Sequence, residues 1–249
     1  MRLVCALACA ALALTLAVTT ASAYIRLEQA CASTPACGGA RSAGAAGPDR
    51  LSTARLVHRA CAAAVGALAL ALAALAWRQP RRAGLRRPCV IVLLLTLFLA
   101  ALGRQASPAS PAVVLANVMG GIALAGVLAW LGTRSCARTS DEASVTPSLA
   151  PLCTLAGLTV ALGVVPGALV MHAAIGLVAA GALATLAMHG PVAHRRCAIA
   201  LTALATLQLG VGPALAAGHF PVGLGVAHNL SGALLVAGLG SLFAQRGSA

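Results

Sequence analysis

The sequence is poor in charged residues. It contains four acidic residues and no lysine, and residues of either charge make up only 8% of its 249 positions. A soluble domain carries about 25% charged residues, so this chain lacks the polar groups that would cover a water-exposed surface. Hydrophobic residues make up 60% of the sequence. These proportions exclude a soluble globular domain and indicate an integral membrane protein.

The basic residues do not form the pattern of a nucleic-acid-binding protein. All 17 are arginines, and they give the chain a net charge of +13. Nucleic acid would need a basic face on a folded soluble surface, and no segment here can supply one. The arginines cluster between apolar runs instead, most densely in the segment 78–87. We therefore expect no nucleic-acid partner and expect the lipid bilayer to surround the protein.

Long apolar runs divide the chain into candidate membrane spans. A helix that crosses about 30 Å of hydrocarbon needs about 20 mainly apolar residues. The runs predict an all-α integral membrane protein with eight transmembrane helices. We place them at 4–23, 56–77, 88–103, 112–132, 149–165, 168–188, 196–216 and 223–243. The third run is short, and Pro166 interrupts the fifth.

The arginines also predict an orientation. Three arginine-rich loops fall on one side of an eight-helix arrangement, together with Arg2 and Arg246. These loops are 78–87, 133–148 and 189–196. Arginine-rich loops stay in the cytoplasm, so we expect both termini in the cytoplasm and the chain in a bacterial inner membrane. The outer loop 24–55 also carries arginines and is a mild exception.

The first apolar run has a second interpretation. Residues 1–23 begin with a basic residue and end in Ala21-Ser22-Ala23, which resembles a signal-peptide cleavage site. Cleavage would leave seven helices, with the rest of the chain oriented as before. We favour a retained helix, because the apolar stretch is longer than the usual core of a signal peptide.

An internal repeat relates the two halves of the chain. The segment Leu115–Gly121 matches Val226–Gly232, and His58 opens the second predicted helix much as His172 opens the sixth. Each half then has four helices in the same orientation, which favours an axis along the membrane normal. We expect two pseudo-symmetric four-helix bundles. They comprise residues 1–133, including the outer loop, and residues 134–249.

Three histidines, His58, His172 and His228, lie near the outer ends of even-numbered predicted helices. Ionisable groups inside a membrane are costly and usually face a partner or a cavity. Two imidazoles on neighbouring helices can bind a heme iron axially. His172 and His228 form such a pair, whereas His58 would face Asn117. The alternative is that these histidines pack between helices through hydrogen bonds.

A zinc or copper site at these histidines is less favoured, because two histidines without an acidic or thiol partner make a poor site for either metal. Cys31 and Cys37 lie in the outer loop, where an oxidising compartment favours pairing of thiols. Their spacing permits a disulfide but does not fix the geometry, so two free thiols stay an alternative. We interpret the other seven cysteines, in or beside apolar runs, as packing residues.

Taken in order along the chain, these residues resemble the heme A synthase family. Cys31–Cys37 resembles its Cys-x-Asp-Trp-Pro-x-Cys loop, and Leu56–Arg59 resembles its Ile-His-Arg helix start. The remaining matches are Ala23–Leu27, Ser110–Asn117 with Gly120-Gly121, Gln208–Gly212 and Ala227-His228. No single motif is very specific, but the ordered set covers nearly the whole chain.

The resemblance implies an activity: oxidation of the C8 methyl group of heme O to a formyl group, which makes heme A for cytochrome oxidase. The first half would hold the substrate heme O, with His58 as the catalytic ligand and Asn117 at the second position. The second half would hold a heme b between His172 and His228. The loop cysteines would act as a redox pair or a structural clip. A heme O synthase, oxidase assembly factors and a second copy of the chain are the partners implied.

The chain departs from the family pattern mainly in its first half. Arg55 stands where the family has glutamate three residues before the histidine of helix two, and Asn117 stands where it has a second histidine. Ser33 and Thr34 replace the aspartate and tryptophan of the loop. A non-catalytic heme-binding assembly factor or heme carrier is therefore the alternative. A small-solute transporter is less favoured, because transporter sites lie near the midplane of the membrane.

Overall fold

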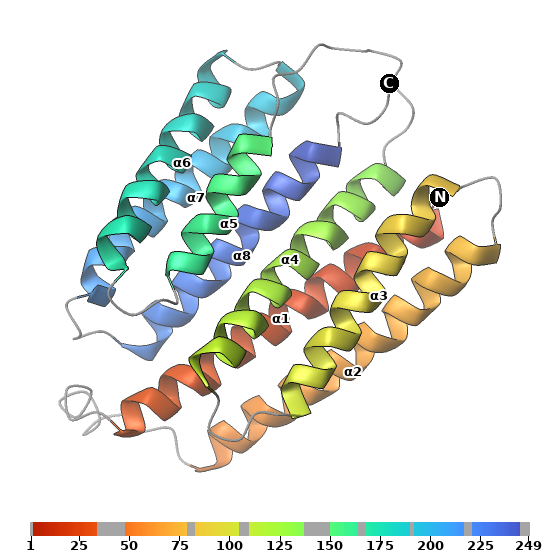
Figure 1. The fold of residues 1–249 in the computed structure, drawn as a ribbon, viewed down its shortest axis with the longest axis horizontal. Coiled ribbons are helices and arrows are strands. Elements are labelled where there is room, and N and C mark those ends of the chain that lie inside the picture. The colour runs from red at the N-terminus through yellow and green to blue at the C-terminus, as the bar shows by residue number, and fades with distance from the viewer. Residues whose placement is uncertain are drawn as a thin grey trace.

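The computed structural model describes residues 2–33, 48–78, 83–104, 110–136, 150–163, 168–189, 192–216 and 221–244. Within these ranges the chain forms eight α-helices and no strand (Figure 1). They are α1 (Arg2–Ser33), α2 (Pro48–Arg78), α3 (Ala83–Arg104), α4 (Pro111–Cys136), α5 (Ala150–Leu162), α6 (Leu169–His189), α7 (Val192–Ala216) and α8 (Val222–Ala244). The predicted all-α class is confirmed.

Seven of the described helices are long and apolar enough to cross a membrane, so the chain is a multi-pass membrane protein. The exception is α5, which has 13 residues. At 1.5 Å per residue it is about 20 Å long, whereas the hydrocarbon is about 30 Å thick. It ends at Leu162, four residues before Pro166. Helices usually end at or before the residue that precedes a proline.

The two ends of the predicted outer loop 24–55 are helical, so its predicted extent is wrong. α1 continues to Ser33, and α2 already begins at Pro48. A proline suits the first position of a helix, because the backbone N–H that it lacks would have no partner there. The alanine, leucine, arginine and glutamate residues of these extensions favour helix in water as well as in lipid. The end of an apolar run therefore does not mark the end of these helices.

The helices of each half pack as a closed ring. In the first half, α1 and α3 each contact both α2 and α4. In the second half, α5 and α7 each contact both α6 and α8. The helices that do not touch are therefore the diagonal ones: α1 with α3 and α2 with α4 in the first half, and α5 with α7 and α6 with α8 in the second. His172 and His228 come from one of these diagonal pairs, α6 and α8.

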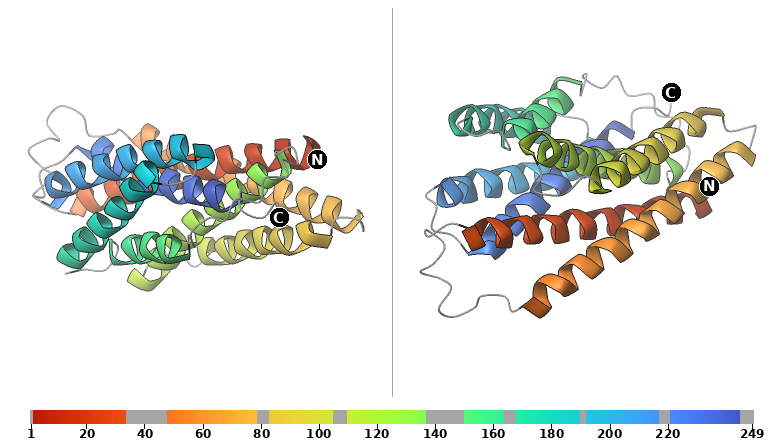
Figure 2. Two further views of the ribbon diagram at one scale, coloured as in Figure 1. Left: turned by 90° about the horizontal axis from the view of Figure 1, so that it is seen from above. Right: turned by 60° about the horizontal axis from the view of Figure 1, so that its bottom comes forward.

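Helix α8 makes most of the contact between the halves, and α5 adds a smaller contact with α4. α8 packs against α4 and also against α1, and Figures 1 and 2 show these three helices in the middle of the molecule. Gly240 of α8 lies so near α4 that a Cβ at this position would overlap the backbone carbonyl of Gly126. Small residues let helix backbones meet in a membrane, where packing rather than the hydrophobic effect holds them together.

The halves differ in how their interiors are filled. Twelve buried residues form the core of the first half, with Leu72, Leu128 and Val92 fully enclosed. The corresponding cluster of the second half has six buried residues among those that the structure describes. The second half also contains a large cavity, which His172 and His228 line.

Candidate functional site

The cavity of the second half has a volume of about 770 Å³. Helices α5 to α8 supply most of its wall, and Val118 and Ile122 of α4 close one side. Its lining is mostly apolar. The polar side chains in the wall are Thr159, His172, Gln208, His228 and Asn229. Volumes of about 300–1,000 Å³ with an apolar lining and a few convergent polar groups are typical of cofactor sites.

His172 of α6 and His228 of α8 face each other across this cavity. Their ring centroids are 6.2 Å apart, and the ring planes are inclined by 59°. An imidazole nitrogen binds a first-row metal ion at about 2 Å, and the ring centroid lies roughly 1 Å behind that nitrogen, so two imidazoles on opposite sides of one iron place their centroids about 6 Å apart. The observed separation fits an iron held between the two rings.

A backbone carbonyl sets the orientation of His172. Its Nδ1 lies 2.7 Å from the carbonyl oxygen of Thr159. A carbonyl oxygen can only accept a hydrogen bond, so Nδ1 carries the proton and the lone pair of Nε2 stays free. Metal-binding histidines usually donate their second ring nitrogen in this way, which fixes both the tautomer and the ring orientation.

Gly163 makes this contact sterically possible. It lies in the turn that follows α5, and its N–H also donates to the Thr159 carbonyl at 3.1 Å. A Cβ at Gly163 would lie 2.9 Å from Cε1 of His172 and 3.0 Å from its Nδ1. Any larger residue here would therefore displace the imidazole.

His228 has an imidazole nitrogen without a protein partner. Its Nδ1 is buried and makes no hydrogen bond within the described part of the chain. Leaving a buried polar atom unsatisfied costs about 1–3 kcal/mol, and a bound group that supplies the partner removes that cost. The backbone at this position is held by Gln208, whose Nε2 donates to the carbonyl of His228 at 2.6 Å and to Oγ of Ser231 at 2.7 Å.

The first-half residues lie in different surroundings. His58 is half-buried on α2, and Asn117 is half-buried on the diagonal helix α4. Neither lines the large cavity. The guanidinium groups of Arg26 and Arg59 act electrostatically on the imidazole of His58, and Arg55 is exposed. A smaller pocket of about 370 Å³, near the end of α1 and the start of α2, does not include His58.

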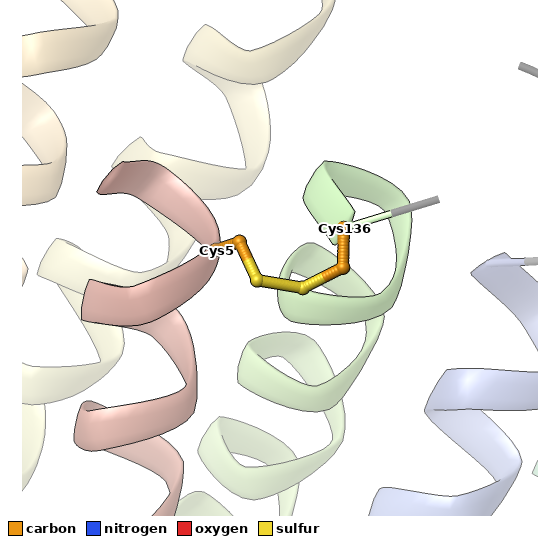
Figure 3. The surroundings of a disulfide bond; sticks show 2 residues. All are labelled: Cys5 and Cys136. Atoms are coloured by element: carbon orange, nitrogen blue, oxygen red, sulfur yellow. A yellow bond between two sulfur atoms is a disulfide. The ribbon is translucent and has the colours of Figure 1, made fainter. Parts of the chain in front are cut away.

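The cysteines depart from the sequence interpretation. Cys31 is disulfide-bonded; its predicted partner Cys37 lies outside the described residues, so this pairing stays a prediction. A disulfide that the sequence did not predict joins Cys5 at the start of α1 to Cys136 at the end of α4 (Figure 3). The interpretation of these two residues as packing cysteines is therefore wrong. They are 131 positions apart, and only the ring packing of the helices brings them together.

The structure thus brings His172 and His228 together, while the other functional contacts of the cavity were not predicted. The partner of His172 is a main-chain oxygen, which any residue at position 159 would supply, so no sequence signal could identify it. Gln208 was part of a motif, but its contact with His228 depends on the packing of α7 against α8. The role of the two histidines as iron ligands stays a prediction.

Comparisons with known proteins add no identification. No model of a known protein family matches the chain, and no functionally characterised protein matches it either. Assignment of a function therefore depends on the motifs of the sequence and on the geometry of the cavity.

Proposed function

We propose that the protein binds a b-type heme in the cavity of its second half, with His172 and His228 as the axial ligands. The observation that carries this proposal is the 6.2 Å separation of the two rings across an apolar cavity. The free Nε2 of His172 and the unsatisfied Nδ1 of His228 support it. Two diagonal helices suit this role, because they approach a flat ligand from opposite faces.

Each part of the cavity wall would have a defined task. When bound, the heme iron supplies one-electron chemistry that no side chain here offers. The Thr159 carbonyl holds one imidazole in position, and Gln208 fixes the backbone that carries the other. The apolar side chains around them exclude water, and exclusion of water from a heme is one of the ways in which a protein tunes it.

The wider function that we propose is heme A synthesis. The protein would oxidise the C8 methyl group of heme O at a first-half site around His58, beside the heme b of the second half. The ordered motifs support this activity, and so does the ring packing that both halves share. In this proposal all eight helices cross a bacterial inner membrane, with α5 as a short span. The halves are then pseudo-symmetric, and both termini lie in the cytoplasm.

A second candidate is a heme-binding assembly factor or heme carrier without catalytic activity. Asn117 favours it, because an amide side chain at the diagonal position cannot replace an imidazole as an iron ligand. Arg55, which replaces the family glutamate, points in the same direction. The two candidates share the second-half heme and differ only in what the first half does.

Pigment analysis separates the two candidates. The chain is expressed in a host that makes heme O but lacks its own heme A synthase, and the hemes of its membranes are extracted and identified. Heme A is the expected product, and its loss in a His58→Ala variant that keeps heme b would assign the activity to the first half. Heme b without heme A would support the carrier. Purified protein without any heme would contradict both.

A further inference from the structure

Three cysteine sulfur atoms meet at the end of the first bundle that holds the N-terminus. Cys5 and Cys9 lie one turn apart on α1, and Cys136 ends α4. The three Sγ atoms all lie within 4.8 Å of one another. α1 and α4 run in opposite directions, so the start of one meets the end of the other (Figure 3).

A glycine makes room for the third sulfur. Gly132 lies one turn before Cys136, and a Cβ at this position would be 3.5 Å from Sγ of Cys9 and 3.8 Å from the methyl group of Ala8. The bare backbone therefore lets α1 approach α4 at the level of Cys9. Cys9 and Cys136 are both exposed, so an ion can reach the cluster from outside.

The reduced cluster would suit a metal ion. Three thiolates that each lie about 2.3 Å from one ion, in a plane, are about 4 Å apart. Cys9 already lies within 4.8 Å of the other two sulfurs, and reduction of the Cys5–Cys136 disulfide frees those two to separate. Thiolates are soft ligands and favour Cu(I), zinc or iron–sulfur clusters. A structural zinc site takes four ligands, and the described residues add no histidine or carboxylate to this group. Cu(I) is the ion of this set that three thiolates serve best.

We propose that Cys5, Cys9 and Cys136, when reduced, bind one Cu(I) ion as a three-thiolate site. Three S–H protons leave as the ion binds, because only the deprotonated sulfurs coordinate it. The resulting centre has a net charge of −2. Among the residues that the structure describes, Arg2 and Arg134 lie within three positions of a ligand cysteine, and their charge would compensate that of the centre.

The Cys5–Cys136 disulfide is the metal-free form of the same cluster. Two of the three ligands are joined in it, and only Cys9 keeps a thiol. A dithiol opens the bond: it gives two electrons and two protons to the two sulfurs and itself becomes a cyclic disulfide. The arginine-rich end is the one that we propose to face the cytoplasm, where thiols are kept reduced. The site is separate from the proposed heme site, whose residues His172 and His228 lie in the other half.

The test is a copper titration of the purified full-length protein in detergent. The protein is reduced with dithiothreitol, freed of it under nitrogen and titrated with Cu(I) against the coloured chelator bicinchoninate. We expect one tightly bound equivalent, with only sulfur neighbours in its X-ray absorption spectrum. Replacement of Cys9 or Cys136 by serine should weaken binding by at least about tenfold, since even loss of a group that only orients a metal ligand costs 10- to 100-fold.

Two controls keep the result specific. Cys61→Ser removes a free half-buried thiol elsewhere in the first half, and it should leave the affinity unchanged. The unreduced wild-type protein tests the same site without any substitution. Because its Cys5–Cys136 disulfide is intact, it should not compete with bicinchoninate for Cu(I). Equal binding before and after reduction, equal losses in Cys61→Ser and Cys9→Ser, or a preference for Zn²⁺ over Cu(I) would overturn the proposal. The heme-to-protein ratio should be the same in all these variants.

Discussion

The two halves have the same ring of helices but use its interior differently. The first half fills the space between its helices with a buried core that includes Leu72, Leu128 and Leu131. The second half leaves a cavity of about 770 Å³ between the corresponding helices. Glycine and alanine supply much of the wall around its two histidines, at Gly163, Ala173, Gly176, Gly212 and Gly232. The second half thus combines a smaller core with a cavity, and the small size of these inward side chains leaves the space that larger ones fill in the first half.

The helix pairs α2–α4 and α6–α8, which carry the predicted ligand positions, also differ between the halves. In the sequence repeat His58 corresponds to His172, whereas Asn117 stands near the place that His228 takes in the second half. The second pair has an oriented imidazole, a cavity and an unsatisfied nitrogen. The first pair has a single imidazole with arginines nearby. The following predictions test this contrast, from the largest expected effect to the smallest.

The shared orientation of the halves depends on whether α5 crosses the membrane. If all eight helices cross, the α2–α3 and α6–α7 links lie on the same side. Reporter fusions in these two links should therefore both give a cytoplasmic signal, and a fusion at residue 45 should give a periplasmic one. A periplasmic signal from the α6–α7 link alone would show that the short α5 does not span, and the halves would then be inverted relative to each other.

Removal of His172 or His228 should abolish most heme binding. His172→Ala and His228→Ala each leave one imidazole in a cavity shaped for two, so the heme-to-protein ratio should fall at least about tenfold. His228→Asn, which gives the second half the amide of the first, should behave in the same way. His58→Ala is the matched control and should retain the heme. The ratio and the low-spin absorption spectrum of purified variants measure the effect; the opposite pattern would assign the heme to the first half.

A change in the orientation of the His172 ring should weaken heme binding nearly as much as loss of the ring. Gly163→Ala adds a methyl group 2.9 Å from Cε1 of His172, which forces the ring away from the Thr159 carbonyl. Loss of such an orienting contact should weaken heme binding by about 10- to 100-fold. Gly157→Ala in α5 is the matched control, because its Cβ meets nothing within 4 Å. Heme titration of both apoproteins measures the difference, and equal affinities would mean that the carbonyl contact does not position the ligand.

The contact between the halves should affect stability and not heme affinity. Gly240→Ala places a methyl group against the carbonyl of Gly126, so α8 must move away from α4. Overpacking of this kind costs about 1–3 kcal/mol, and thermal unfolding in detergent should occur at a lower temperature. Gly181→Ala in α6, where a Cβ has no neighbour within 4 Å, should not lower it. An unchanged unfolding temperature for Gly240→Ala would mean that the halves are not closely packed at this point.

The sequence predicted the class of the protein and its helices, but not all of their ends. Composition predicted the all-α membrane class, and the apolar runs predicted eight helices, each of which overlaps one of those observed. The extent of α1 and α2 was underestimated, because the residues beyond Ala23 and before Leu56 are also good helix formers. The shortness of α5 was partly visible in Pro166, whereas the turn at Gly163 was not recognised.

By itself, the sequence determined which solvent surrounds this protein and which helices carry ionisable groups, because both follow from the local supply of apolar and polar side chains. Only the tertiary structure decided which helices are diagonal. The sequence already paired His172 with His228, but the packing sets their rings 6.2 Å apart. It also directs Nδ1 of His172 to a main-chain oxygen of α5 and joins Cys5 to Cys136 across 131 positions. Such contacts link helices that are distant in sequence. They depend on the order of packing around each ring, which no local pattern of residues encodes.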